Sequence, residues 1–192
     1  MAQQPTFILA SSSPRRLALL KDIGIKPDQV ISPDIDETPK KQEQPRELAY
    51  RLAFEKLQAV ATQYEGTYII AADTVVGVGR RILPKAENAA EVRECLRMMS
   101  GRRHHIYTGV ALKNPAGKIL RRLSDSTVIF RRLSTADIEA YAECGEGVGK
   151  AGGYNLQGCA QMMVRFMSGS YSGIIGLPLF DVGQMLRGAG WN

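Results

Sequence analysis

The sequence predicts a mixed α/β fold, in which a sheet of mixed strand direction is flanked by helices. Strand-like and helix-like segments alternate throughout the 192 residues, which is typical of α/β and α+β folds. The segments His105–Asn114 and Lys118–Phe130 flank the turn sequence Asn-Pro-Ala-Gly and should pair as a hairpin. Because a hairpin between helices introduces antiparallel pairing, an all-parallel sheet is not expected.

The first half of the chain predicts three strands and two helices. Thr6–Ala10 is a short buried strand, and a helix over Pro14–Ile23 follows it, with a serine N-cap, a first-position proline and a glycine after its end. Gln29–Ile35 is a candidate second strand. A long helix over Pro45–Tyr64 precedes Thr67–Val78, which carries the strongest strand signal.

The second half predicts three helices and a further strand beside the hairpin. Val92, Cys95, Leu96 and Met99 share one face of the first of these helices, and Ser134 with Asp137 forms a capping box at the second. The predicted segments are, in order, a helix over Asn88–Met99, a helix over Ser134–Glu143, a glycine-rich stretch over Gly145–Gly158, a strand over Ala160–Met167, and Ile174–Leu179 leading into a final helix that ends near Arg187.

Length and composition predict one soluble domain over residues 1–192. Apolar residues make up 44% and charged residues 23%, and a chain of this length buries enough core to fold without metal or disulfide. The thiols of Cys95, Cys144 and Cys159 are expected to be reduced, as in a cytoplasmic protein. No apolar run is long enough to span a membrane, and the N-terminus lacks the basic region of a signal peptide.

The segment Ser11–Arg16, Ser-Ser-Ser-Pro-Arg-Arg, is a candidate phosphate site. It places three hydroxyls and the free N–H groups of a helix start beside Arg15 and Arg16. Cations in a first turn oppose the helix dipole, and a polyanionic ligand would offset that conflict. The alternative is a capped helix with two solvated arginines. The net charge of +6 is compatible with anionic partners, either nucleic acid or small phosphates.

Asp73 is the candidate catalytic carboxylate. It lies within the apolar strand Tyr-Ile-Ile-Ala-Ala-Asp-Thr-Val-Val, where an ionised carboxylate costs several kcal/mol unless it is paired or bound to metal. The functional interpretation is a metal ligand or general base at a cleft. The alternative is a buried aspartate that caps a neighbouring helix.

Lys56 lies in the middle of the apolar face of its predicted helix, in the row of Leu48, Leu52 and Val60. It must either snorkel to solvent or reach a buried anion. Glu37 lies in an acidic loop, and such loops are usually only solvated. It could also complete a metal site with Asp73, because Mg²⁺ takes one or two carboxylates plus phosphate oxygens and waters.

Taken in order, these motifs resemble the Maf family of nucleoside triphosphate pyrophosphatases over nearly the whole chain. The resemblance rests on LASSSPRR near the start, DET at Asp36–Thr38, FEK ending at Lys56, AADTVV around Asp73, PK at Pro84–Lys85, YTGV at Tyr107–Val110, KAGGYNLQG at Lys150–Gly158 and GLPL at Gly176–Leu179. The family often has Gly-Lys-Pro where this chain has Leu83-Pro84-Lys85-Ala86, and an aspartate where it has Gly149.

The resemblance implies a strongly bent mixed sheet with a deep cleft between two lobes, a Maf- and ITPase-like fold. It also implies that Asp73 is catalytic, that Glu37 and Asp73 hold a divalent cation, Mg²⁺ or Mn²⁺, and that one group of side chains binds the substrate. That group is Ser11, Ser13, Arg15, Arg16, Lys56, Thr74, Lys85 and Gln157. Among these, Arg15, Thr74 and Gln157 match the subgroup that acts on dTTP and UTP.

The expected function is therefore hydrolysis of dTTP or UTP, and of modified pyrimidine nucleotides, to the monophosphate and pyrophosphate, a house-cleaning reaction. No stable nucleic-acid or membrane partner is expected, and because family members are often dimers, a homodimer stays open. The rival from another class is a non-enzymatic nucleic-acid-binding or septum-regulatory module, although no basic run interleaved with aromatics supports it. A second rival is a phosphatase that releases single phosphates.

Overall fold

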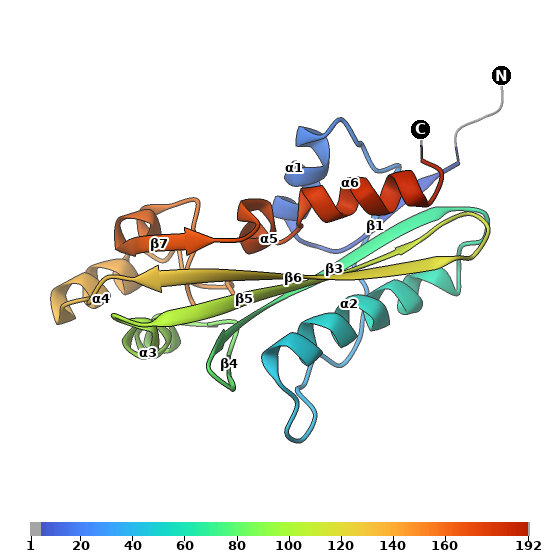
Figure 1. The fold of residues 1–192 in the computed structure, drawn as a ribbon. Coiled ribbons are helices and arrows are strands. Elements are labelled where there is room, and N and C mark those ends of the chain that lie inside the picture. The colour runs from blue at the N-terminus through green and yellow to red at the C-terminus, as the bar shows by residue number, and fades with distance from the viewer. Residues whose placement is uncertain (1–4, 192) are drawn as a thin grey trace.

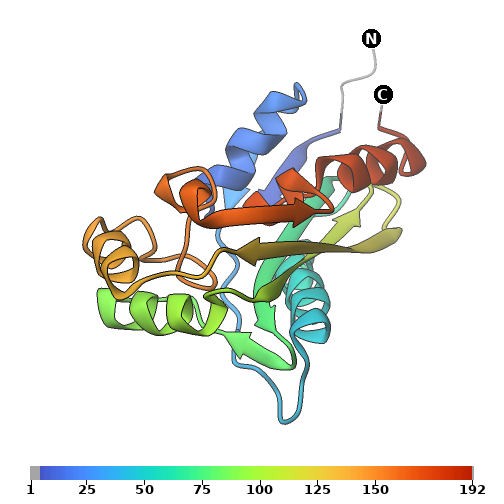
Figure 2. The same ribbon diagram turned by 60° about the vertical axis from the view of Figure 1, so that its left-hand side comes forward.

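The computed structural model describes residues 5–191, which form a seven-stranded mixed sheet flanked by helices (Figures 1 and 2). The strands are β1 (Phe7–Ala10), β2 (Gln29–Ile31), β3 (Tyr68–Val78), β4 (Arg81–Leu83), β5 (Arg103–Lys113), β6 (Ile119–Phe130) and β7 (Val164–Ser168). The helices are α1 (Pro14–Asp22), α2 (Pro45–Ala61), α3 (Ala89–Met99), α4 (Thr135–Glu143), α5 (Tyr171–Ile175) and α6 (Leu179–Gly188), with a 3-10 turn at Cys159–Met163.

The strand order is β2-β1-β3-β5-β6-β7, and β4 also pairs with β3. The β1–β2 and β1–β3 pairs are parallel, whereas β3, β5, β6 and β7 form an antiparallel series. The long strands β5 and β6 are the predicted hairpin, paired from Arg103 with Ile129 to Lys113 with Ile119. The sheet is therefore mixed, as the sequence predicts.

Helices cover both faces of β3, so alternate residues of this strand enter different cores. Ile69 and Ala71 pack with Leu57 and Val60 of α2 on one face. Ile70, between them, belongs to the larger core on the other face, which includes residues of α1 and α6. Figure 1 shows α2 on one side of the sheet and α1 and α6 on the other. The same alternation determines which face of the sheet each polar side chain of β3 points to.

Most predicted elements are confirmed, and the corrections concern element ends and two very short elements. The predicted strand Gln29–Ile35 is only β2, because it pairs with β1 over three residues. The predicted strand Ala160–Met167 is wrong in its first part, where Cys159–Met163 is a 3-10 turn. The sequence also gave no signal for the short strand β4 or the one-turn helix α5, since elements of three and five residues are too short to show periodicity.

A buried histidine of β5 should make the stability of the protein depend on pH. The His104 ring is fully buried against Phe130 and Tyr154, and its Nε2 lies 3.0 Å from the Tyr154 hydroxyl oxygen. Burial lowers the pKa of His104 to about 4. Between this value and the unfolded value near ~6.5, the unfolded chain binds a proton that the folded chain does not. Folding is therefore disfavoured as the pH falls through that window.

We expect the titration of His104 to lower the free energy of unfolding by about 3 kcal/mol between pH 7 and pH 4. Urea unfolding of the wild type and of His104→Gln at pH 7, 5 and 4 measures this loss. The difference in unfolding free energy between the two proteins should shift in favour of the variant as the pH falls. A pH-independent difference would contradict the expectation.

Candidate active site

The sheet is open on one side of β3, at the middle of that strand. β1 pairs with β3 from Tyr68 to Ala71, and β4 pairs with it from Val76 to Val78. Both β1 and β4 lie on the side of β3 opposite to β5, because β5 pairs along nearly the full length of β3. Among the described strands, residues 72–75 therefore have a partner on the β5 side alone. We call this opening the sheet gap.

Three predicted site segments meet at the sheet gap because of this topology. Asp73 and Thr74 lie in the unpaired stretch of β3 itself. Ser11 follows the last residue of β1, and Lys85 follows β4 by two residues. Open sheets bind ligands where neighbouring chain segments diverge at strand ends. The gap is such a place.

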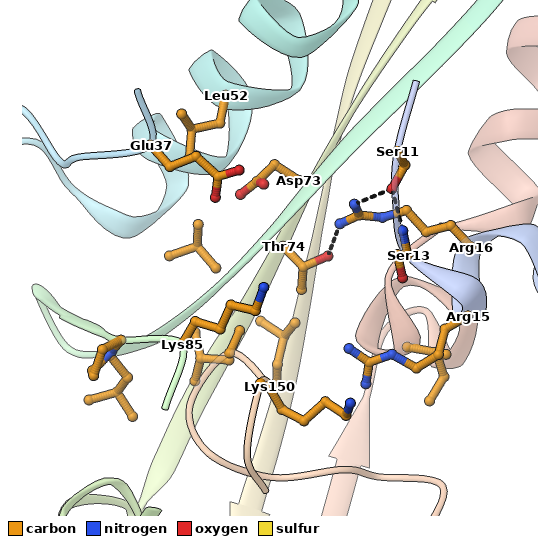
Figure 3. A pocket seen from close by; sticks show the side chains of 18 of the residues that line it. Ser11, Ser13, Arg15, Arg16, Glu37, Leu52, Asp73, Thr74, Lys85 and Lys150 are labelled. Atoms are coloured by element: carbon orange, nitrogen blue, oxygen red, sulfur yellow. Dashed lines mark hydrogen bonds between the residues drawn. The ribbon is translucent and has the colours of Figure 1, made fainter. Parts of the chain in front are cut away.

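A pocket of about 620 Å³ occupies this part of the molecule (Figure 3). Of the ten residues predicted to form the site, nine line this pocket, and Gln157 does not. The nine are Ser11, Ser13, Arg15, Arg16, Glu37, Lys56, Asp73, Thr74 and Lys85. They come from α1 and the turn before it, the loop before α2, α2 itself, β3, and the segment after β4.

Strand alternation directs Asp73 toward α2 and Thr74 toward α1. The Asp73 Oδ1 oxygen accepts a hydrogen bond from Lys56 Nζ at 2.5 Å, and Glu37 Oε1 lies 2.7 Å from the same nitrogen. Asp73 and Lys56 are each 7% exposed. Lys56 therefore reaches a buried anion and does not snorkel to solvent. Its ammonium holds two carboxylates from different segments beside each other.

Arg16 is held on the Thr74 side of β3 by three oxygen atoms. Its guanidinium donates to the carbonyl oxygen of Gly176 at 2.9 Å, to Ser11 Oγ at 3.0 Å and to Thr74 Oγ1 at 3.3 Å. Burial lowers the pKa of Arg16, whereas the negative charge of Asp73 raises it. The second arginine of the helix start is therefore a fixed positive charge in the pocket wall, not a solvated surface residue.

The Thr74 hydroxyl is committed to a chain of hydrogen bonds in this structure. Thr108 Oγ1 donates to the Gly173 carbonyl oxygen at 2.8 Å, and a hydroxyl donates only once. The 3.1 Å contact between the Thr74 and Thr108 hydroxyls must therefore have Thr74 as the donor. Thr74 then accepts from Arg16. Its hydroxyl orients the arginine and has only one remaining lone pair for a ligand.

Lys150, in the glycine-rich stretch, also lines the pocket, although no role for it was predicted from the sequence. In Figure 3 its ammonium lies beside the guanidinium of Arg15, with Lys85 nearby. Burial lowers the pKa of Lys150, and the positive charges of Arg15 and Lys85 lower it further. The available signal was a single lysine among closely spaced glycines. That signal does not indicate which way the side chain points.

Gln157 is exposed, and its backbone N–H bonds to Asn155 Oδ1 at 3.4 Å. Its neighbour Leu156 is buried and lines the pocket. The side chain that the resemblance assigns to base recognition thus lies outside the lining described here. Its role in recognising the base stays a prediction.

Glu37 and Asp73 could hold a divalent cation. Both supply carboxylate oxygens, which are suitable metal ligands, and both contact the same Lys56 ammonium. The pocket is wide enough for phosphate oxygens to supply further ligands. Within residues 5–191, no group of three or more His, Cys, Asp or Glu side chains is suitably placed for a metal. The donor set therefore fits a hard cation such as Mg²⁺ that shares its coordination with a phosphate ligand, and not a closed protein cage.

Comparison with known proteins identifies close relatives over the full length. A sequence model of the Maf-like protein family matches residues 6–189. A protein of Novosphingobium aromaticivorans named dTTP/UTP pyrophosphatase is 50% identical over 190 residues, covering 99% of this chain and 94% of its own. A protein of the same name from Caulobacter vibrioides is 50% identical over 192 residues, covering 100% of both chains.

Among solved structures, a HAM1 protein from Coxiella burnetii superposes with a TM-score of 0.50 at 18% identity, covering 97% of this chain and 100% of its own. At this identity the likeness concerns the fold alone. Through residues 5–191, the helices are too short or too polar to cross a bilayer.

Proposed function

The chain belongs to the Maf-like protein family, and from that premise we propose that it hydrolyses dTTP and UTP to the monophosphate and pyrophosphate. The names of the relatives at 50% identity support the proposal. The observation that carries it is the charge layout of the pocket. Two carboxylates, Glu37 and Asp73, flank one part of it, and uncompensated cations flank the other. Such a layout suits a polyphosphate that reacts at one of its phosphorus atoms.

The proposed reaction is attack of water on the α-phosphorus. The new bond joins the water oxygen to that phosphorus, and the bond to the oxygen that bridges the α- and β-phosphates breaks. That bridging oxygen leaves with the pyrophosphate and carries the electron pair of the broken bond. Asp73 accepts the proton of the water, since it is the most deeply buried carboxylate of the pocket and lies in the stretch of β3 that borders the sheet gap.

The cations of the pocket would stabilise the charge of the substrate. Arg16 is oriented by three protein oxygens before any ligand arrives, which reduces the reorganisation needed in the transition state. The N-terminus of α1 adds free backbone N–H groups, since the Ser13 side chain does not cap them. Both features favour a phosphoryl group near the Ser11–Arg16 turn.

A divalent cation, when bound by Glu37 and Asp73, would neutralise phosphate charge and lower the pKa of a bound water. Mg²⁺ and Mn²⁺ are the candidates. Lys56, which shares both carboxylates, would keep them oriented with or without the metal. The cytoplasmic location and a homodimer stay predictions.

A panel of nucleoside triphosphates tests the proposal, with pyrophosphate and orthophosphate measured separately in Mg²⁺ or Mn²⁺. We expect pyrophosphate as the product and a kcat/KM for dTTP and UTP at least ~10-fold above that for GTP and ATP. The physical reason is that the wrong base leaves buried polar groups unpaired. Orthophosphate as the first product would indicate a phosphatase, and no product at all would indicate a binding module.

Gln157→Glu tests whether the exposed glutamine reads the base. If residues around Leu156 fold onto a bound pyrimidine, loss of the amide donor should erode the preference for dTTP and UTP. An unchanged ratio of kcat/KM values would assign the preference to other residues of the pocket. That result would not contradict the proposed release of pyrophosphate.

A further inference from the structure

We infer that Lys150 is a further substrate-binding residue, which binds the pyrophosphate half of the triphosphate together with Arg15 and Lys85. We call these three side chains the cation cluster. The inference deepens the proposed function and rests on it for the identity of the leaving group. Three independent observations carry it: the unbalanced charge, the anchoring of the loop, and the position relative to Asp73.

The cation cluster carries positive charge without paired carboxylates. Among the described residues, Lys56 is the one cation of this pocket that forms an ion pair with a carboxylate. Arg15, Lys85 and Lys150 come from three segments far apart in the sequence, yet two of them lie close enough to lower the pKa of the third. Mutual repulsion of this kind is unfavourable without a ligand. An anion with several charges would remove it.

The segment that carries Lys150 is anchored to the segment that carries Lys85. The Gly149 N–H donates to the Ala86 carbonyl at 2.7 Å, and the Ala86 N–H donates to the Lys150 carbonyl at 3.2 Å. Gly152 N–H donates to the Pro84 carbonyl at 2.9 Å. The two lysines thus belong to one backbone-bonded unit. Their spacing is fixed by the main chain and not by flexible loops.

Glycines make this close pairing possible. A Cβ atom on Gly147 would lie 2.2 Å from the Gly153 carbonyl oxygen, so only glycine fits there. Gly149 and Gly152 have φ values of 74° and 68°, in the left-handed region that favours glycine. Gly152 also packs on the Val76 side chain of β3. The glycine-rich stretch is therefore a packed support, and Lys150 projects from it into the pocket.

Arg15 and Lys150 lie across the pocket from the carboxylates, and the Lys85 ammonium lies between them, beside Thr74 (Figure 3). Figure 3 shows Glu37 and Asp73 on one side of Thr74, and Arg15 with Lys150 on the other. If water attacks the phosphorus beside Asp73, the phosphates farther along the chain extend toward the cluster. The leaving pyrophosphate carries more charge than the monophosphate product, so it is the half that requires three cations.

Calorimetric titration of the full-length protein with pyrophosphate, and separately with UMP, in the same Mg²⁺ buffer tests the inference. Lys150→Met keeps most of the side-chain bulk and removes the charge. We expect at least ~10-fold weaker pyrophosphate binding, with UMP affinity within ~2-fold of wild type. Lys150→Arg should recover most of the pyrophosphate affinity, because the charge returns.

Lys118→Met is the matched control, since Lys118 is exposed at the tip of the β5–β6 hairpin. It should bind pyrophosphate like the wild type. Equal pyrophosphate affinity of wild type and Lys150→Met would overturn the inference. A larger loss for UMP than for pyrophosphate, or no wild-type binding of pyrophosphate, would overturn it as well.

This test separates failure of the inference from failure of the proposed function. A protein without hydrolytic activity can still be titrated with pyrophosphate and UMP. Conversely, pyrophosphate release by the wild type together with unchanged binding in Lys150→Met would leave the proposed function standing and remove Lys150 from it. Thermal melts of each variant show that the fold is retained.

Discussion

Asp73→Asn should lower kcat for dTTP and UTP by at least ~10²-fold, the scale of a lost general base or metal ligand. The substitution keeps the shape of the side chain and removes its charge and its capacity to accept a proton. The fold should remain, because Lys56 keeps a carboxylate partner in Glu37 at 2.7 Å. Steady-state kinetics with purified protein, beside a thermal melt, measure both quantities.

Asp22→Asn is the control for this experiment, because Asp22 is an exposed aspartate at the end of α1, away from the pocket lining. It should retain wild-type kinetics. A folded Asp73→Asn protein with wild-type turnover would show that the reaction does not depend on this carboxylate. The assignment of the sheet gap as the reaction centre would then be wrong.

Lys56→Met should lower kcat/KM by about 10²-fold, the cost of removing one charged donor from a preorganised site. Two effects combine. The substrate loses a cation, and Glu37 and Asp73 lose the ammonium that holds them beside each other. Stability should fall too, because Asp73 is 7% exposed and loses its ammonium partner, whereas the Glu37 side chain is 55% exposed and can turn to water. Kinetics and melts on the same preparations separate the two changes.

Lys113→Met provides the contrasting case of a structural lysine. Lys113 Nζ donates to the carbonyl oxygens of Tyr64 at 2.7 Å and Ala61 at 3.4 Å, where α2 ends. Its loss should lower the melting temperature and leave kcat/KM unchanged. If Lys56→Met behaved like Lys113→Met, with lower stability and unchanged kinetics, Lys56 would be a structural residue as well.

Much of the site could be predicted from conflicts within the sequence. An aspartate in an apolar strand, a lysine on an apolar helix face and two arginines in a first turn each break a local rule. In the structure the buried aspartate and the buried lysine compensate each other through the Asp73–Lys56 hydrogen bond. The arginines of the first turn are compensated in part, because Arg16 donates to Ser11 and Thr74. Residues that violate local preference are informative because something distant must compensate them.

The remaining features depend on tertiary placement that no local rule encodes. Lys150 breaks no rule in a glycine-rich loop, so nothing marked it for the pocket. Gln157 sits in the same loop, yet its side chain is exposed and outside the pocket lining. The direction of a loop side chain is decided by the bonds between Gly149, Ala86 and Lys150, which join distant segments. The sheet gap likewise follows from where β1 and β4 stop, and strand ends are the least predictable part of a sequence.

The sheet gap also limits how far this chain could be made more stable by design. Extending β1 or β4 along β3 would satisfy more main-chain groups of residues 72–75 and produce a continuous sheet, as most stability-oriented redesign would favour. The same change would close the opening that Asp73 and Thr74 border. Thermostable variants should therefore come from substitutions at the far ends of β5 and β6 or in the surface helices. The missing strand pairing at residues 72–75 is a defect by the standards of an ideal sheet. A redesign that completed it would produce a more stable protein with no room for a nucleotide.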